Sequence, residues 1–126
     1  MEAKEACSLR ILIIEDNKDL ATLLCSLLEL MGHNAVSANI GTAGLRIAKE
    51  NKPDVIFCDI GLPDMDGHEV AKQIRSEEHL KDVFLVALTG YAGNNDKELA
   101  LDAGFNRHIS KPIDSTTLKW ILDNRE

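Results

Sequence analysis

Asp54-Val55-Ile56-Phe57-Cys58-Asp59, followed directly by Ile60-Gly61-Leu62-Pro63-Asp64-Met65-Asp66-Gly67, is the stretch of sequence that decides the fold. Its first part is a short and almost continuous apolar run, which is typical of a parallel strand covered on both faces. Its second part is rich in Gly, Pro and Asp, the residues that favour turns. Asp59 stands at the junction, so we expect its carboxylate at the carboxyl end of a buried strand.

Strand and helix patterns alternate along the rest of the chain. Apolar runs of four to six residues indicate strands, and apolar residues at helical spacing indicate helices between them. Parallel strands joined by helices form an open sheet with helices on both faces, so the predicted fold class is α/β. We expect strands at residues 9–14, 34–38, 55–58, 83–88 and 107–110, and helices at residues 17–31, 42–51, 67–76, 94–103 and 114–123.

The bulk properties of the chain limit its organisation and its partners. The chain has 126 residues, which suits one domain, and we expect residues 1–8 to be a flexible lead-in to a domain at 9–126. A net charge of -7 disfavours direct binding to nucleic acid or to anionic membranes. The three cysteines lack the spacing of a zinc site, and reduced cysteines favour a cytoplasmic protein.

Polar residues follow four of the predicted strands. Glu15 and Asp16 come after the first strand and Asp59 ends the third, while Thr89 and Lys111 come just after the fourth and fifth. Ligands of open parallel sheets bind beyond the carboxyl ends of the strands, where the strand order reverses. If the order is 2-1-3-4-5, the first and third strands are neighbours there, and the two acidic clusters meet.

Three carboxylates in one pocket repel one another, and a divalent cation relieves that repulsion. Magnesium prefers oxygen ligands and usually takes one or two carboxylates together with phosphate oxygens and water. We therefore expect Asp16 and Asp59 to supply carboxylate ligands and the Gly61 backbone carbonyl to supply a third ligand. Glu15 has a longer side chain, and we expect it to act through a bound water.

The same residues suit phosphoryl transfer. The Asp59 carboxylate can attack a phosphoryl group and form an acyl phosphate. Lys111 would add positive charge beside the metal, and the Thr89 hydroxyl would donate a hydrogen bond to a phosphoryl oxygen. Taken singly, each residue also has an ordinary explanation: Asp16 as a helix cap, Asp59 as a turn residue, Thr89 as a loop residue and Lys111 as a solvated lysine. The joint placement at four strand ends is far more specific.

Four segments together resemble the receiver domain of two-component response regulators, and the resemblance covers residues 9–123. It implies a single-domain flavodoxin-like (βα)5 fold with a five-stranded parallel sheet in the order 2-1-3-4-5. The segments are Ile13-Ile14-Glu15-Asp16-Asn17, the run from Asp59 to Gly67, Ala87-Leu88-Thr89-Gly90 and Ser110-Lys111-Pro112.

The resemblance also implies roles for these residues. Asp59 would be the phosphoacceptor, charged from a phosphohistidine of a sensor histidine kinase or a histidine phosphotransfer protein. Asp16, Asp59 and the Gly61 carbonyl would bind magnesium with Glu15 nearby, Lys111 would pair with the phosphoryl group, and Thr89 would move to meet it. Such a domain is a phosphorelay switch and not an enzyme, with self-phosphorylation and autodephosphorylation as its only chemistry, and it acts on an output domain or a partner protein. The Lys111-Pro112 bond is often cis in the family.

The chain departs from the family pattern at two positions. His108, three residues before Lys111, occupies the place where the family often has the Tyr or Phe of a switch that works with Thr89. Gly61, two residues after Asp59, has no side chain to orient an attacking water.

Three other functions remain as alternatives. One is a degenerate receiver that serves only as a docking module. A magnesium-dependent aspartyl phosphatase of the haloacid dehalogenase type would need a second Asp where Gly61 stands. A flavin mononucleotide binder would have its phosphate repelled by Glu15 and Asp16.

Overall fold

The structure, a computed structural model, describes residues 8–90 and 103–125. The expected helix at 94–103 lies outside the described residues except for Ala103, and the expected lead-in at 1–8 lies outside them except for Ser8. All remaining expected elements fall within the described part of the chain.

Five parallel strands form one sheet in the order β2-β1-β3-β4-β5, which confirms the predicted fold class and the strand order that the resemblance implied. The first and third strands are therefore neighbours at the point where the order reverses. The strands are β1 (Arg10–Ile14), β2 (Asn34–Ala38), β3 (Val55–Asp59), β4 (Phe84–Thr89) and β5 (Arg107–Ser110).

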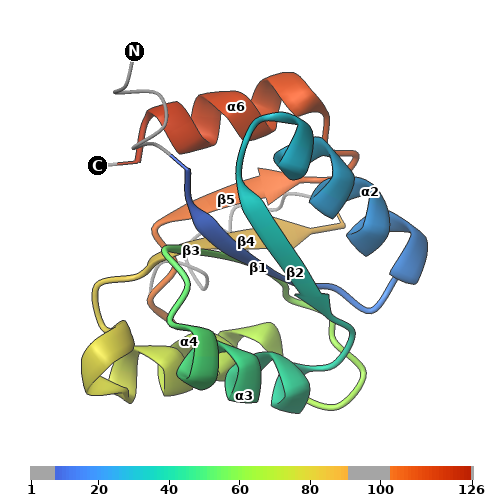
Figure 1. Cartoon of the computed structure of the whole chain (residues 1–126). Helices are drawn as coiled ribbons and strands as arrows, with labels where there is room; N and C mark the ends of the chain where they lie inside the picture. The colour runs from blue at the N-terminus through green and yellow to red at the C-terminus, as the bar shows by residue number, and fades with distance from the viewer. Residues whose placement is uncertain (1–7, 91–102, 126) are drawn as a thin grey trace.

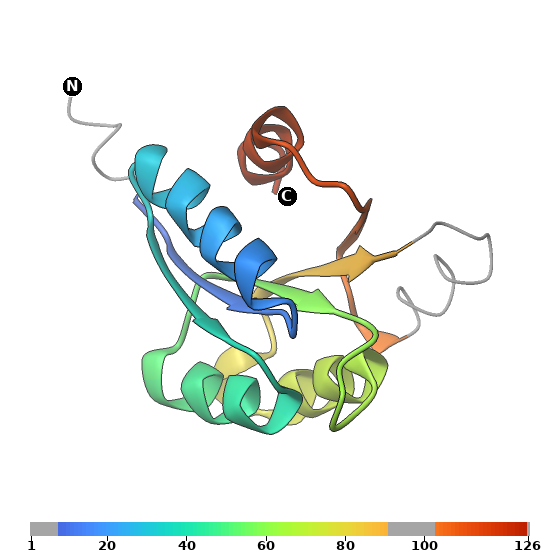
Figure 2. The same ribbon diagram turned by 90° about the vertical axis from the view of Figure 1, so that its right-hand side faces the viewer.

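Helices cover both faces of the sheet (Figure 1). Helices α2 (Lys18–Leu30) and α6 (Ser115–Asp123) lie on one face, and α3 (Gly41–Asn51) and α4 (Gly67–Ser76) lie on the other, followed by a short 3-10 turn, η1 (Glu78–Leu80). Figure 2 looks onto the edge of the sheet where the strands end, with one helix pair above and the other below. Each layer encloses a buried apolar cluster, because alternate residues of each strand point to opposite faces.

Polar side chains begin three of the helices. Asn17 accepts a hydrogen bond from the backbone N–H of Leu20 at the start of α2. Asp66 accepts one from the N–H of His68 at the start of α4, and Asp114 accepts one from the N–H of Thr117 at the start of α6. Such caps satisfy N–H groups that have no partner within the helix. The cap of α2 is therefore Asn17 and not Asp16, whose ordinary explanation in the sequence was a helix cap.

Two strands extend one residue further than expected. Asp59 pairs with Leu88 inside the ladder between β3 and β4, and Thr89 pairs with Ser110 between β4 and β5. The sequence placed Thr89 just past its strand, because a polar residue before Gly90 resembles a loop. In the structure both residues have strand backbone, so backbone hydrogen bonds hold them in place at the carboxyl ends of their strands.

Arg75, near the end of α4, joins three segments at the opposite edge of the sheet. Its guanidinium donates to the carbonyls of Lys81, Val83 and Gly104 and to the side-chain oxygen of Asn106, over 2.6–3.0 Å. These bonds fix the approach to β4 and to β5. Gly104 has a φ of +117°, and a Cβ there would lie 2.9 Å from Arg75 Cγ, so the contact favours glycine for two reasons.

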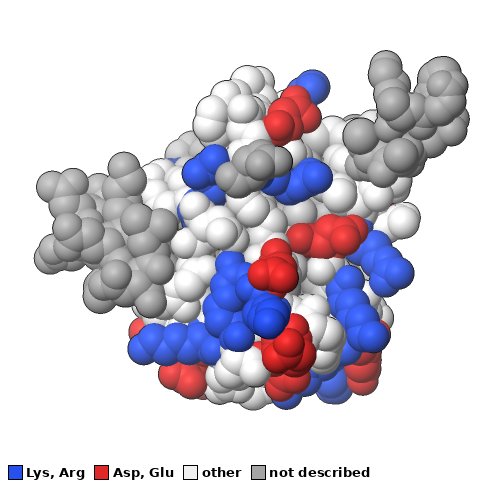
Figure 3. Space-filling view, turned by 90° about the vertical axis from the view of Figure 1, so that its left-hand side faces the viewer, with Lys and Arg blue, Asp and Glu red and all other residues white. Residues whose placement is uncertain are grey.

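The two ends of the sheet differ in charge. The face in Figure 3, where the strands begin, carries Lys and Arg side chains interspersed with Asp and Glu, so neither sign dominates it. At the other end, carboxylates gather. Among the described residues, no helix has both the length and the apolar character needed to cross a membrane.

Candidate functional site: an acidic cluster at the ends of β1 and β3

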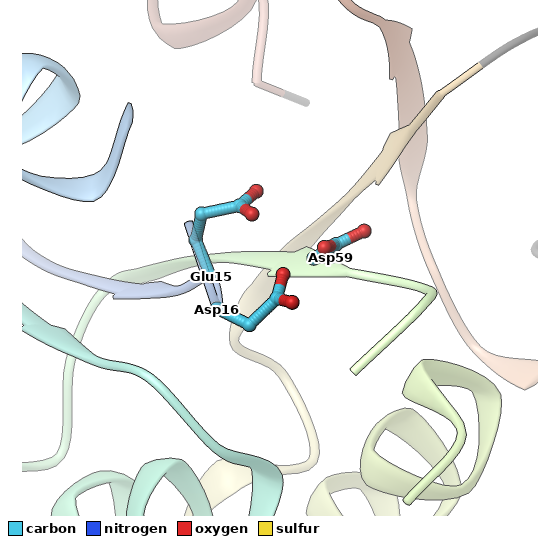
Figure 4. Close-up of side chains that lie close together, drawn as sticks. All are labelled: Glu15, Asp16 and Asp59. Atoms are coloured by element: carbon cyan, nitrogen blue, oxygen red, sulfur yellow. The ribbon is translucent and has the colours of Figure 1, made fainter. Parts of the chain in front are cut away.

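Three carboxylates meet where β1 and β3 end. Oxygens of Glu15, Asp16 and Asp59 all lie within 4.8 Å of one another. Glu15 and Asp16 extend from the end of β1 toward Asp59 on β3 (Figure 4). Glu15 and Asp59 are buried, while Asp16 is exposed, so the cluster is open to solvent on one side. The expected meeting of the two acidic segments is confirmed.

Glu15 is the most deeply buried member of the cluster. Its side chain is 1% exposed, and its Oε2 accepts a hydrogen bond from the backbone N–H of Asn17. Its Oε1 lies 2.9 Å from Lys111 Nζ. Burial raises the pKa of the Glu15 carboxyl above its ordinary value, and the charge of Asp59 adds to this, although the contacts with Lys111 and Asn17 act in the opposite direction.

Among the described residues, Lys111 brings the one cation in contact with this cluster. Its Nζ lies 3.5 Å from Asp59 Oδ2 in addition to its closer contact with Glu15. Burial opposes the charged ammonium, but the hydrogen bond with Glu15 and the charge of Asp59 outweigh it, so the pKa of Lys111 is raised. Its backbone N–H donates to the Thr89 carbonyl over 2.8 Å, and the Lys111-Pro112 bond is cis, as the resemblance implied.

The loop after β3 holds Asp59 from two sides. The Gly61 N–H donates to Asp59 Oδ1 over 3.1 Å, which orients the carboxylate. The Gly67 N–H donates to the Ile60 carbonyl, and a Cβ at Gly67 would lie only 2.5 Å from the Asp59 carbonyl oxygen. Only glycine allows this close approach of the start of α4 to the end of β3. Gly61 is exposed, and nothing lies within 4 Å of the place a Cβ would take.

Thr89, at the end of β4, contacts His108 on the neighbouring strand β5. Thr89 Oγ1 lies 3.1 Å from His108 Nε2 and 3.5 Å from the Ile109 carbonyl oxygen. Thr89 is 5% exposed, and His108 is half-buried. The two candidate switch residues are therefore hydrogen-bonded to each other, a contact that the sequence did not predict.

Asp64 contributes to the site in a way that sequence reasoning missed. Its carboxylate accepts hydrogen bonds from the backbone N–H groups of Gly41 and Thr42, over 2.7 and 3.0 Å. It thus caps α3, since Ile40 at the capping position has no side-chain acceptor. These bonds lower the pKa of the Asp64 carboxyl. The apolar residue at Ile40 was the available signal that the cap comes from elsewhere.

The chain is similar to known proteins over most of its length. The family model for the response regulator receiver domain matches residues 11–123. The polar-differentiation response regulator DivK of Brucella ovis is 35% identical over 103 residues, which cover 82% of this chain and 84% of that protein. The chain therefore belongs to the response regulator receiver domain family, whose members are switches of two-component signalling.

Solved structures agree with this assignment. The receiver domain of a sensor histidine kinase of Pseudomonas aeruginosa, with a magnesium ion coordinated in its active-site cleft, is 31% identical with a TM-score of 0.86, covering 94% of this chain and 97% of that chain. A chemotaxis response regulator of Vibrio cholerae has a TM-score of 0.89, covering 94% of this chain and 99% of that chain, and at 24% identity it shows the fold alone.

Proposed function

We propose that this domain accepts a phosphoryl group onto Asp59 in a magnesium-dependent reaction and changes conformation in response. The observation that carries the proposal is the convergence of Glu15, Asp16 and Asp59 within 4.8 Å, with Lys111 Nζ 3.5 Å from the Asp59 carboxylate. This arrangement offers a nucleophilic carboxylate, oxygen ligands for a hard cation and a fixed positive charge in one place.

The acidic cluster fits magnesium. Its side chains offer only oxygen atoms, the ligands this ion prefers, and the raised pKa of Glu15 reflects a site where negative charge is costly. We assign Asp16, Asp59 and the Gly61 backbone carbonyl as ligands, with Glu15 acting through water. A magnesium ion bound there would offset negative charge on the phosphoryl oxygens.

The protein's own groups position the reaction. An Asp59 carboxylate oxygen attacks phosphorus, the bond from phosphorus to the donor's imidazole nitrogen breaks, and that nitrogen keeps the electron pair and takes up a proton. Lys111 stabilises charge on the phosphoryl oxygens, and the Thr89 hydroxyl moves to donate a hydrogen bond to one of them. Gly61 N–H, already bonded to Asp59 Oδ1, keeps the other carboxylate oxygen in place.

The donor class follows from the family. We propose a phosphohistidine of a sensor histidine kinase or a histidine phosphotransfer protein, and an output domain or partner protein as the reader of the switch. Self-phosphorylation from small donors and autodephosphorylation would be the only intrinsic chemistry. The receiver domain would span residues 9–126. Cytoplasmic placement is supported by Cys25 and Cys58, which are free thiols among the described residues.

The test is phosphorylation by acetyl phosphate with magnesium. We expect a hydroxylamine-labile phosphate on the unmodified protein and none on Asp59→Asn, while Asp123→Asn, at an exposed carboxylate on α6, should behave as the unmodified protein. Phosphate on Asp59→Asn at the unmodified rate would disprove the assignment. Absence of any magnesium-dependent phosphorylation of the unmodified protein would favour the docking-module alternative.

A further inference from the structure

We infer that His108 acts as a latch that holds the Thr89 hydroxyl in the unphosphorylated state and has to release it when Asp59 is phosphorylated. This inference rests on the proposed function, because it concerns how that same site is regulated. His108 is then a positioning residue that acts through Thr89.

The latch is built into the pairing of β4 and β5. His108 lies opposite Ala87, two residues before Thr89, so both side chains point to the same face of the sheet. Thr89 Oγ1 and His108 Nε2 are 3.1 Å apart, a good hydrogen-bond distance. The Lys111 N–H donates to the Thr89 carbonyl, which fixes the backbone of Thr89 while its side chain remains the part that can turn.

The latch engages the Thr89 hydroxyl in either tautomer of His108. A threonine hydroxyl has one hydrogen to donate. If His108 Nε2 is the acceptor, that hydrogen is used in the latch. If His108 Nε2 carries a hydrogen and donates, the Thr89 hydrogen turns to the Ile109 carbonyl at 3.5 Å. In both tautomers Thr89 has to leave His108 before its side chain moves to a phosphoryl group.

A phenyl ring at position 108 would fill space but make no such bond. The histidine therefore stabilises the unphosphorylated arrangement through its hydrogen bond with Thr89. A two-state switch responds to any interaction present in one state only. The latch should lower the affinity of the site for a phosphoryl group or its analogue.

The experiment is a double-mutant cycle read out by binding of beryllofluoride with magnesium. The four proteins are the unmodified chain, His108→Phe, Thr89→Val and the double variant, and dissociation constants come from NMR titration of backbone amides. His108→Phe removes the hydrogen bond to Thr89 and should therefore lower the dissociation constant for beryllofluoride about fivefold. In the Thr89→Val background, the same change should have no effect, because the latch is already absent.

Two results would overturn the latch: no tightening by His108→Phe, or equal tightening with and without the Thr89 hydroxyl, which would indicate packing alone. His108→Leu also lacks a hydrogen-bonding side chain and should tighten binding to a similar extent, which provides a second test if the Phe variant does not fold. If the unmodified chain does not bind beryllofluoride, the proposed function itself fails. If the unmodified chain binds beryllofluoride and His108→Phe binds it equally well, the latch is disproved and the proposed function is not.

Discussion

Lys111 and Glu15 form a 2.9 Å ion pair in which the carboxylate is almost completely buried. The lysine is nearer to Glu15 than to Asp59, at 3.5 Å. Lys111 therefore has two roles in this arrangement. It neutralises a buried carboxylate, and it stands within reach of the group that would attack phosphorus. Its raised pKa keeps the ammonium charged for both.

Replacement of Lys111 tests the second role. We expect Lys111→Met to slow phosphorylation by acetyl phosphate about a hundredfold, the usual cost of removing one group that stabilises transition-state charge. The rate of acyl-phosphate formation is the measurement. Lys119→Met is the matched control, since Lys119 is 70% exposed and pairs with Asp123 on the same helix. A Lys111→Met rate close to that of this control would show that the lysine is only structural.

Magnesium should stabilise the fold by relieving repulsion within the acidic cluster. At a free concentration of 100 times its dissociation constant, a ligand that binds only the native state adds about 2.7 kcal/mol to the free energy of unfolding. We expect a corresponding rise in the thermal midpoint that chelation reverses. Asp16→Asn should weaken binding about tenfold or more, since even an outer partner of a metal ligand costs that much. An unchanged midpoint with added magnesium would count against a metal site here.

Gly67 and Gly61 form a matched pair for testing the loop that follows Asp59. Gly67→Ala places a Cβ 2.5 Å from the Asp59 carbonyl oxygen, and such overpacking costs about 1–3 kcal/mol. Gly61→Ala meets nothing within 4 Å and should change the free energy of unfolding by less than about 1 kcal/mol. Urea denaturation measures both. Equal effects of the two substitutions would mean that the close approach at Gly67 does not matter.

Asp64 should make stability depend on pH. Its pKa is lowered in the native state by the N–H groups of Thr42 and Gly41, so the native state binds the proton less readily than the unfolded chain. The stabilisation is therefore complete above the ordinary aspartate value of about 3.9 and is lost as the pH falls through the lowered native value. The urea midpoint of the unmodified chain should exceed that of Asp64→Asn at neutral pH, and the gap should narrow in acid. A gap that is constant with pH would exclude this charge effect.

Local sequence signals predicted most of the fold. The apolar runs gave β1 and β3 to within one residue, and α4 has the expected bounds, because Asp66 and Gly67 mark its start. The acidic ends of β1 and β3 then predicted the cluster, since parallel neighbours bring their carboxyl ends together. The roles of Asp59, Lys111 and Thr89 in phosphoryl transfer remain predictions.

Contacts between distant segments were not predictable in the same way. The cap that Asp64 gives to α3 joins residues more than twenty positions apart, and nothing local to either end encodes that pairing. The bond between Thr89 and His108 depends on the register of β4 and β5, which a sequence pattern does not specify. Lys111 was expected to face the phosphoryl site, and its nearer contact with Glu15 follows from side-chain packing.

The cap from Asp64 has a practical consequence for watching this protein at work. The loop that follows Asp59 is joined to the first turn of α3 by two hydrogen bonds, so neither can open without exposing the amides of Gly41 and Thr42. Amide exchange with deuterium occurs when such bonds break. The exchange rates of these two amides therefore report how often the loop opens, and they can be measured without any label at the site itself.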